Sequence, residues 1–138
     1  MRDLRVQCPL PPYDRLKARI CIHQNGDVDA RVAVRFGELR ESLRLQNEIL
    51  AQLPEGTIHT PLKAGPPWAA GIGWVEGWRG EVFTWVRADD NNCIDRCHPQ
   101  DPSWVLWPAL EYAVLGNIVP DFPLINKSFN LSYSGHDL

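Results

Sequence analysis

Three side chains that suit a soft metal lie close together in Cys93-x-x-x-Cys97-His98. Two thiolates and an imidazole would suit a tetrahedral zinc site, which needs further ligands. The candidates for those further ligands are Cys21, His23 and His59. In an extended strand, residues 93 and 97 point to the same face about 13 Å apart, which is too far for one ion. Ordinary strand cysteines are therefore the favoured interpretation, and we predict no bound metal.

The end of the chain, SFNLSYSGHDL over residues 128–138, has the spacing of a ligand loop but not its ligands. Ser132 and Gly135 are three residues apart, as two metal-binding cysteines often are. A hydroxyl is a poor ligand for a soft metal and glycine has no side chain, whereas thiolates are what such sites select. We interpret His136 as a surface histidine rather than a replacement ligand. No G-x-S-x-G or H-E-x-x-H motif is present either.

A polar stripe is the third candidate, formed by Arg31, Arg35, Glu38 and Ser42. Spacings of three and four place these side chains on one face of a helix. By itself such a stripe fits a solvated face with charge pairs between successive turns. A functional interface is the alternative interpretation.

The element that must position this stripe is a long amphipathic helix. Asp27 is a suitable N-cap, and Pro54 limits the far end. The apolar residues step by threes and fours, with Gln46 or Asn47 filling one gap. They are Val32, Phe36, Leu39, Leu43, Leu50 and Leu53.

The remaining pattern predicts an α+β fold, in which a long and a shorter helix pack with a small antiparallel β-meander. We expect strands over residues 73–78, 81–88 and 93–98, with turns at Arg79-Gly80 and residues 89–92. The shorter helix is predicted over residues 104–115. Apolar alternation predicts a further strand over residues 15–22, after an extended entry segment (1–14). Residues from Asn117 onward are expected to be loop-like.

Composition limits the class of protein. The 138 residues fit one domain (1–138), with 44% hydrophobic and 22% charged side chains. A net charge of −3 disfavours non-specific nucleic-acid binding. No apolar run is long enough to span a membrane, and the first residues do not open a signal peptide. Reduced thiols in the cytoplasm are thus expected for the four cysteines. Six tryptophans favour core and interface packing, and a stacking platform for sugars or bases is a weaker alternative.

Three stretches together resemble a known family. They are GDVDARVAVRFGELRESL (26–43), GIGWVEGWRGEVFTWV (71–86) and VPDFPLINKSFNLSYSG (119–135). In order and spacing they are similar to the large subunit shared by respiratory complex I and the formate hydrogenlyase-type membrane-bound [NiFe]-hydrogenases. The resemblance covers about residues 12–138. Since that subunit is longer, the resemblance implies a C-terminal portion that is not expected to be catalytic alone.

The resemblance assigns residues to motifs. Arg31, Arg35, Glu38 and Ser42 match its helix motif, so their stripe would face a subunit or cofactor-proximal interface. The hairpin motif is matched by Glu76, Arg79, Gly80 and Glu81, although Gly77-Trp78 replaces the family's Ala-Pro. Ser132 and Gly135 stand where the hydrogenases carry two nickel-binding cysteines, and Asn130 stands where they carry an aspartate.

These assignments imply an oxidoreductase subunit, NADH:quinone oxidoreductase-like or formate hydrogenlyase-like, that has no nickel ligands. No cofactor is expected on this chain; the family's iron–sulfur clusters lie in a partner subunit, and only its hydrogenases hold a NiFe centre. The implied partners are the small iron–sulfur subunit and membrane subunits. The implied location is cytoplasmic, on the inner face of the membrane through those partners. The alternative is a non-catalytic scaffold or assembly module that kept the fold.

Overall fold

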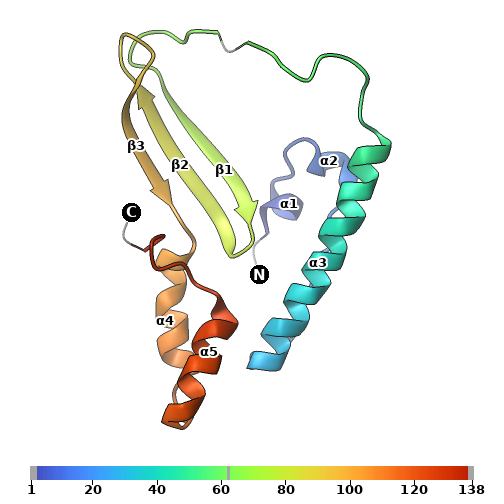
Figure 1. Ribbon diagram of the computed structural model, residues 1–138, viewed down its shortest axis with the longest axis vertical. Coiled ribbons are helices and arrows are strands. Elements are labelled where there is room, and N and C mark those ends of the chain that lie inside the picture. Colours follow the sequence, from blue (N-terminus) through green and yellow to red (C-terminus); the bar gives the residue numbers. More distant parts are fainter. Residues whose placement is uncertain (1–2, 62, 137–138) are drawn as a thin grey trace.

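A computed structural model of the chain describes residues 3–61 and 63–136. It is an α+β structure with a three-stranded antiparallel sheet and a long helix, as predicted. The helices are α1 (Leu4–Gln7), α2 (Tyr13–Leu16), α3 (Val28–Ala51), α4 (Ser103–Ala113) and α5 (Phe122–Phe129), with a 3-10 turn η1 (Val119–Asp121) before α5. Figure 1 shows α3 on one side of the molecule, and the sheet with α4 and α5 on the other.

The sheet is a simple meander in the order β1 (Ala70–Gly77), β2 (Gly80–Ala88), β3 (Ile94–Gln100). A two-residue turn at Trp78-Arg79 joins the first two strands, and Gly80 follows it with φ +131°. That backbone conformation favours glycine. The next turn includes Asn92 at φ 60°, in the left-handed region that asparagine tolerates. All three strands confirm the predicted meander within a few residues at each end.

The predicted long helix is confirmed as α3. The side chain of Asp27 caps it by accepting a hydrogen bond from the backbone N–H of Ala30 at 2.8 Å. The buried residues of α3 are Ala30, Glu41 and Leu45, which do not belong to the predicted apolar stripe. That stripe is exposed along its length, so the helix turns a mixed, partly polar side to the rest of the chain.

Two predictions near the N-terminus were wrong. The described part of the entry segment contains α1 and α2 rather than extended chain, and residues 15–22 form no strand. From Lys17 the chain runs along α3 instead: the Arg19 backbone N–H donates to the Glu41 carboxylate at 2.9 Å. The alternating apolar residues do mark one covered side of this segment, because Leu16 is buried and Ala18 and Ile20 are half-buried. Their packing partner is a helix and not a neighbouring strand.

The prediction of loop-like structure after Asn117 was also wrong, because α5 occupies much of that region. Pro120 and Pro123 lie in the first turns of η1 and α5, where a missing N–H is tolerated. Asn130 ends α5 in the left-handed conformation at φ 53°. The shorter predicted helix is confirmed as α4, with Pro108 inside it.

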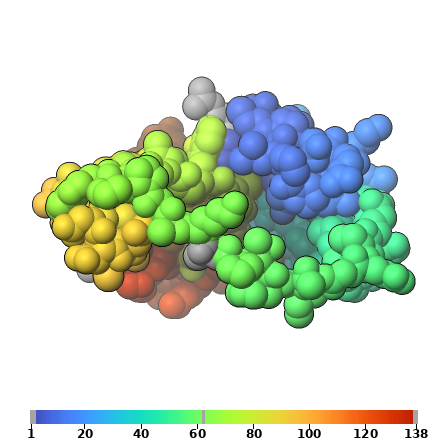
Figure 2. Space-filling view, turned by 90° about the horizontal axis from the view of Figure 1, so that it is seen from above, coloured from blue at the N-terminus to red at the C-terminus, as the bar shows by residue number. Residues whose placement is uncertain are grey.

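Few apolar side chains are buried in the described part of the chain. Those that are buried are Leu4, Leu16, Ala30, Leu45, Leu110 and Ile125. Trp68, Trp74, Trp78 and Trp104 stay about half exposed, so these four do not fill a core of this chain, and the predicted packing at an interface stays a prediction for them. Figure 2 views the molecule from above, and the green connection between α3 and β1 lies at the front of that view. Among residues 3–61 and 63–136, no helix combines the length and the apolar character needed to cross a membrane.

Candidate functional site

A cavity in the described part of the chain lies between α3, the β1–β2 turn and α5, and has a volume of about 420 Å³. We call it the cleft. Its charged lining residues are Arg31, Arg35, Arg79, Asp3, Glu38 and Glu76. Three cations and three carboxyl groups therefore line one cavity, beside apolar residues such as Val34 and Leu106. It brings together residues from both predicted motifs.

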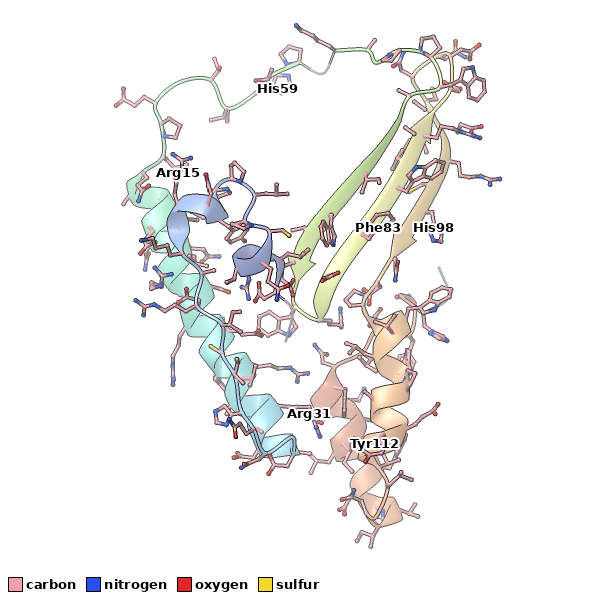
Figure 3. All side chains as sticks on the ribbon, turned by 180° about the vertical axis from the view of Figure 1, so that it is seen from behind. Arg15, Arg31, His59, Phe83, His98 and Tyr112 are labelled. Atoms are coloured by element: carbon pink, nitrogen blue, oxygen red, sulfur yellow. The ribbon has the colours of Figure 1, made fainter. Side chains whose placement is uncertain are left out.

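The α3 side of the cleft is tied to α5 through Arg31. Its Nε donates to the Ser128 hydroxyl at 2.8 Å, and its guanidinium also donates to the Gly26 carbonyl at 2.6 Å. The same guanidinium lies 4.3 Å from the ring centroid of Phe129, within range of a cation–π interaction. Figure 3 shows Arg31 directed from α3 toward α5. A polar residue of the first motif therefore contacts the C-terminal segment.

Two further arginines reach the same end of α5. Arg35 donates to the backbone carbonyl of Ser128, and Arg79, in the hairpin turn, donates to the carbonyl of Asn130, each at 2.5 Å. The last carbonyls of a helix lack intrahelical partners and carry the negative end of the helix dipole. Cationic donors are favourable there. The arginines thus satisfy the C-terminus of α5 and join three segments that are far apart in sequence.

Two carboxyl groups of the cleft, those of Asp3 and Glu76, lie at the N-terminal segment of the chain. Glu76 accepts a hydrogen bond from the Leu4 backbone N–H at 3.0 Å, and Asp3 forms an ion pair with Arg5 at 2.6 Å. Burial raises the pKa of Glu38 and that of Glu76 above the usual value for glutamate. The hydrogen bond from Arg5 lowers the pKa of Asp3. Burial likewise lowers the pKa of Arg31 and of Arg35.

The structure groups five of the seven predicted interface residues in the cleft: Arg31, Arg35, Glu38, Glu76 and Arg79. Ser42 does not line it. Glu81 lies opposite Glu76 in the β1–β2 register but lines a separate hollow with residues of β1, β3 and α4. The cleft therefore contains most of the predicted set, and whether it serves a partner stays a prediction.

Sequence reasoning missed Asp3, Ser128 and Phe129, which also line the cleft. Ser128 was placed in a loop, so its position on a helix facing α3 was not anticipated. The signals for that helix were present in the prolines near its start and in Asn130 at its end. Asp3 caps α1 through the Arg5 backbone N–H, a local signal that was also available.

The residues at the predicted vestigial positions do not fit nickel. The Ser132 hydroxyl accepts a hydrogen bond from the Gly135 backbone N–H at 3.0 Å. The backbone N–H of Ser132 donates to the Ser103 hydroxyl at 2.9 Å. A β-carbon added at Gly135 would lie 2.6 Å from Cγ of Asp101, so a cysteine there would collide. His136 is exposed and lies beside the rings of Trp104 and Trp107.

The cysteine motif is not gathered into a metal site. Cys93 precedes β3, Cys97 lies on it, and both are exposed. Over residues 3–61 and 63–136, no cluster of three or more His, Cys, Asp or Glu side chains is arranged to hold an ion. His98 lies on the sheet with Cys97, as Figure 3 shows for the histidine, and Cys21 lines the cleft instead.

Several known proteins have sequences similar to this chain. The chain is 34% identical over 136 residues to hydrogenase-4 component G of Escherichia coli, an alignment that covers 99% of this chain and 24% of that protein. It is 31% identical to the carbon monoxide-induced hydrogenase of Rhodospirillum rubrum, over 93% of this chain and 36% of that protein. An NADH-quinone oxidoreductase subunit of Wolbachia pipientis wMel is 28% identical, with 98% of this chain and 42% of that protein covered.

A solved structure agrees. The membrane-bound sulfane sulfur reductase, an archaeal respiratory membrane complex, contains a chain that superposes with a TM-score of 0.83 at 27% identity, covering 99% of this chain and 39% of that one. The fold and sequence are thus those of a class of respiratory and hydrogenase subunits. The family profile described as "Respiratory-chain NADH dehydrogenase, 49 Kd subunit" matches residues 1–70. The chain belongs to this family, which confirms the resemblance, and it spans between 24% and 42% of the length of these curated relatives.

Proposed function

We propose that this chain serves as part of the large subunit of a multi-subunit electron-transfer complex and is not catalytic by itself. Family membership supports this, together with relatives whose names are those of hydrogenases and NADH-quinone oxidoreductase subunits. The observation that carries the proposal is the convergence of the helix and hairpin motifs on one cleft. Charged residues from distant segments are gathered there, while within the part of the chain that the structure describes no group of three or more His, Cys, Asp or Glu side chains is arranged to hold a metal ion.

In this proposal, the cleft forms a wall beside the iron–sulfur cluster of a small partner subunit. Proteins tune such clusters through burial, nearby charge and hydrogen bonds, while the cluster performs the electron transfer. Arg31, Arg35 and Arg79 would supply positive charge at that wall, and their hydrogen bonds to α5 would fix its shape. No cofactor is assigned to this chain itself.

The proposed partners are the small iron–sulfur subunit and, through the assembled complex, membrane subunits. One relative is named formate hydrogenlyase subunit 5, another is named an NADH-quinone oxidoreductase subunit, and the similar solved chain belongs to a respiratory membrane complex, which supports this setting. We also propose a peripheral position on the inner face of the membrane, held by those partners.

A non-catalytic scaffold or assembly module is the second candidate function. The crowded contact between Gly135 and Asp101 favours it, because it leaves no room for a side chain at the position that the resemblance aligns with a nickel-binding cysteine. The two functions differ in one observable. A subunit that forms the wall of a cluster alters the reduction potential of that cluster when its charges change, whereas a scaffold alters only the amount of complex assembled.

Binding of the purified small iron–sulfur subunit to this chain, measured by calorimetry, tests the proposal. Arg35→Ala should weaken binding about tenfold, a loss of about 1.4 kcal/mol, and shift the cluster potential. Arg96→Ala is the matched control, because Arg96 is an exposed arginine on β3 outside the cleft. No binding by the unchanged chain would refute the proposal. So would an Arg35 variant that unfolds more easily but binds equally well, since the cleft would then be only an internal contact.

A further inference from the structure

The turn before α3 contains Asn25-Gly26, a dipeptide whose two residues can react with each other. It is the one place in the sequence where glycine follows asparagine. Both residues are exposed, and Gly26 has φ +68°, a conformation that glycine adopts without a steric penalty. In the described part of the chain, no hydrogen bond holds the Asn25 side chain or the Gly26 backbone N–H. Neither reacting group is therefore held away from the other.

The reaction available to this pair is deamidation through a cyclic imide. The backbone nitrogen of Gly26 attacks Cγ of Asn25, and a bond forms between these two atoms. The side-chain amide leaves as ammonia and takes the proton of the backbone N–H, which leaves a succinimide ring. Water then opens the ring at either carbonyl carbon. Opening at Cγ gives aspartate, whereas opening at the main-chain carbonyl gives isoaspartate, in which the backbone continues through the former side chain.

The other asparagines do not combine these features. Each of them is followed by a residue with a side chain, whose β-carbon hinders the attack. Asn117 is also exposed, but Ile118 follows it, and its side-chain amide donates to the Ala113 carbonyl at 3.1 Å. Asn126 lies within α5, where hydrogen bonds of the helix hold the backbone. The structure thus distinguishes Asn25 from the rest of its kind.

The reactive turn borders the cleft. Gly26 is one of the lining residues, and its carbonyl accepts a hydrogen bond from the Arg31 guanidinium at 2.6 Å. Nε of the same guanidinium donates to the Ser128 hydroxyl on α5. Isoaspartate at position 25 would lengthen the backbone by one carbon atom just before Gly26. The carbonyl that Arg31 contacts would then be displaced.

We propose that Asn25 is a modification site, where spontaneous deamidation yields aspartate and isoaspartate and so changes the charge and the backbone beside the cleft. Water is the co-reactant, and no enzyme is required. Each product adds one negative charge to a chain whose net charge is −3. The isoaspartate form also loosens the contact between Arg31 and the turn before α3. This inference goes beyond the proposed function and does not depend on it.

Incubation of the purified chain at mildly alkaline pH tests the proposal. Proteolysis and peptide mass spectrometry at intervals measure the conversion of each asparagine to an acid. Asn25 should convert at least about tenfold faster than Asn117, which corresponds to a barrier about 1.4 kcal/mol lower. Asn117 is the internal control, because it is exposed in the same molecule but is not followed by glycine. Labelling with an isoaspartyl methyltransferase should detect isoaspartate at position 25 as well.

Three variants make the test specific. Gly26→Ala should slow conversion of Asn25 at least about tenfold, because its β-carbon hinders the attack. That β-carbon would meet no atom within 4 Å, so the only strain is that of a positive φ. Asn25→Gln avoids this strain and should also convert far more slowly, since its longer side chain closes a less favourable ring. Hydrogen exchange at the start of α3 should be faster in the isoaspartate form than in Asn25→Asp, which changes the charge alone.

Three results would overturn the proposal. Conversion of Asn25 no faster than that of Asn117 would show that the turn is not a modification site. Aspartate formed without isoaspartate, or an unchanged rate in Gly26→Ala, would exclude attack by the Gly26 nitrogen. Equal hydrogen exchange in the isoaspartate form and in Asn25→Asp would show that the altered backbone does not loosen the contact with Arg31.

Discussion

Gly135 lies against the side chain of Asp101, so closely that a β-carbon at position 135 would be 2.6 Å from Cγ and 2.7 Å from Cβ of the aspartate. Asp101 cannot easily move away, because its carboxylate accepts a hydrogen bond from the Ser103 backbone N–H at 2.7 Å. The Ser103 hydroxyl in turn accepts from the Ser132 backbone N–H. The small residue is therefore part of a packed contact between the start of α4 and the C-terminal segment.

The first prediction follows from this contact. Gly135→Ala should lower the free energy of unfolding by about 1–3 kcal/mol, the usual cost of overpacking. Urea unfolding followed by circular dichroism measures it. Gly71→Ala is the matched control, because a β-carbon at Gly71 would meet no atom within 4 Å. Equal stability of the two variants would contradict this prediction, because it would mean that Asp101 can move to make room for a β-carbon at position 135 without loss of stability.

The second prediction concerns the link between α3 and α5. Ser128→Ala removes the hydroxyl that accepts from Arg31 and donates to the Ile125 carbonyl. We expect a loss of about 1–2 kcal/mol, since bonds to charged groups exceed neutral ones but this one is only partly buried. Hydrogen exchange should rise in α5 and at the start of α3. Ser42→Ala, on α3 outside the cleft, should leave both measurements unchanged, and a similar loss there would argue against a specific link.

Elements with local signals could be predicted from the sequence. The Asp27 cap defines where α3 begins, and turn residues such as Asn92 separate alternating apolar strands. Ser128 was not found, because its role requires α5 to lie against α3, a tertiary relationship that no short pattern contains. The end signal at Asn130 was local, and it could have corrected the loop-like expectation.

The segment at residues 15–22 shows a different limit. Alternation reports that one side of an extended chain is covered, but it does not report what covers it. Here Cys21 approaches α3 at Gly37, where a β-carbon would lie 2.8 Å from its sulfur. Only a residue without a side chain permits that distance. The helix thus takes the place of a neighbouring strand, and the same limit explains why the apolar stripe of α3 did not reveal which of its faces is covered.

The third prediction is a pH dependence at Glu41. Hydrogen bonds from Arg44 and the Arg19 backbone N–H lower its pKa to about 2, from an ordinary value of 4.5. The unfolded chain therefore takes up a proton at higher pH than the folded chain does. The stability that Glu41 contributes is complete above pH 4.5 and is lost as the pH falls toward 2.

Glu41→Gln should accordingly be less stable than the unchanged chain at pH 7, and the difference should shrink as the pH falls through this window. Urea unfolding at a series of pH values measures it. Glu111→Gln, at an exposed position on α4, serves as the control and should keep the pH profile of the unchanged chain. A constant difference between the Glu41 variant and the unchanged chain at every pH would contradict the assignment.

The fourth prediction has the opposite sign and tests the cleft. Burial raises the pKa of Glu38, with Asp3 and Glu76 acting in the same direction and Arg5 and Arg35 opposing it. The folded chain therefore holds this proton more tightly than the unfolded chain does. The contribution of Glu38 to stability is most favourable below its ordinary pKa and declines as the pH rises through the raised value. At neutral pH the half-buried carboxylate of Glu38 is therefore a cost to the fold.

Glu38→Gln should then be more stable than the unchanged chain at pH 7, with the advantage disappearing below about pH 4. The midpoint of urea unfolding at both pH values is the measurement. Glu55→Gln, in the exposed connection after α3, should show no such change. A less stable Glu38 variant at pH 7 would mean that attraction to Arg5 and Arg35 outweighs burial. The expected result, a more stable Glu38→Gln variant at pH 7, would indicate that the carboxylate of Glu38 serves the cleft and not the stability of the fold.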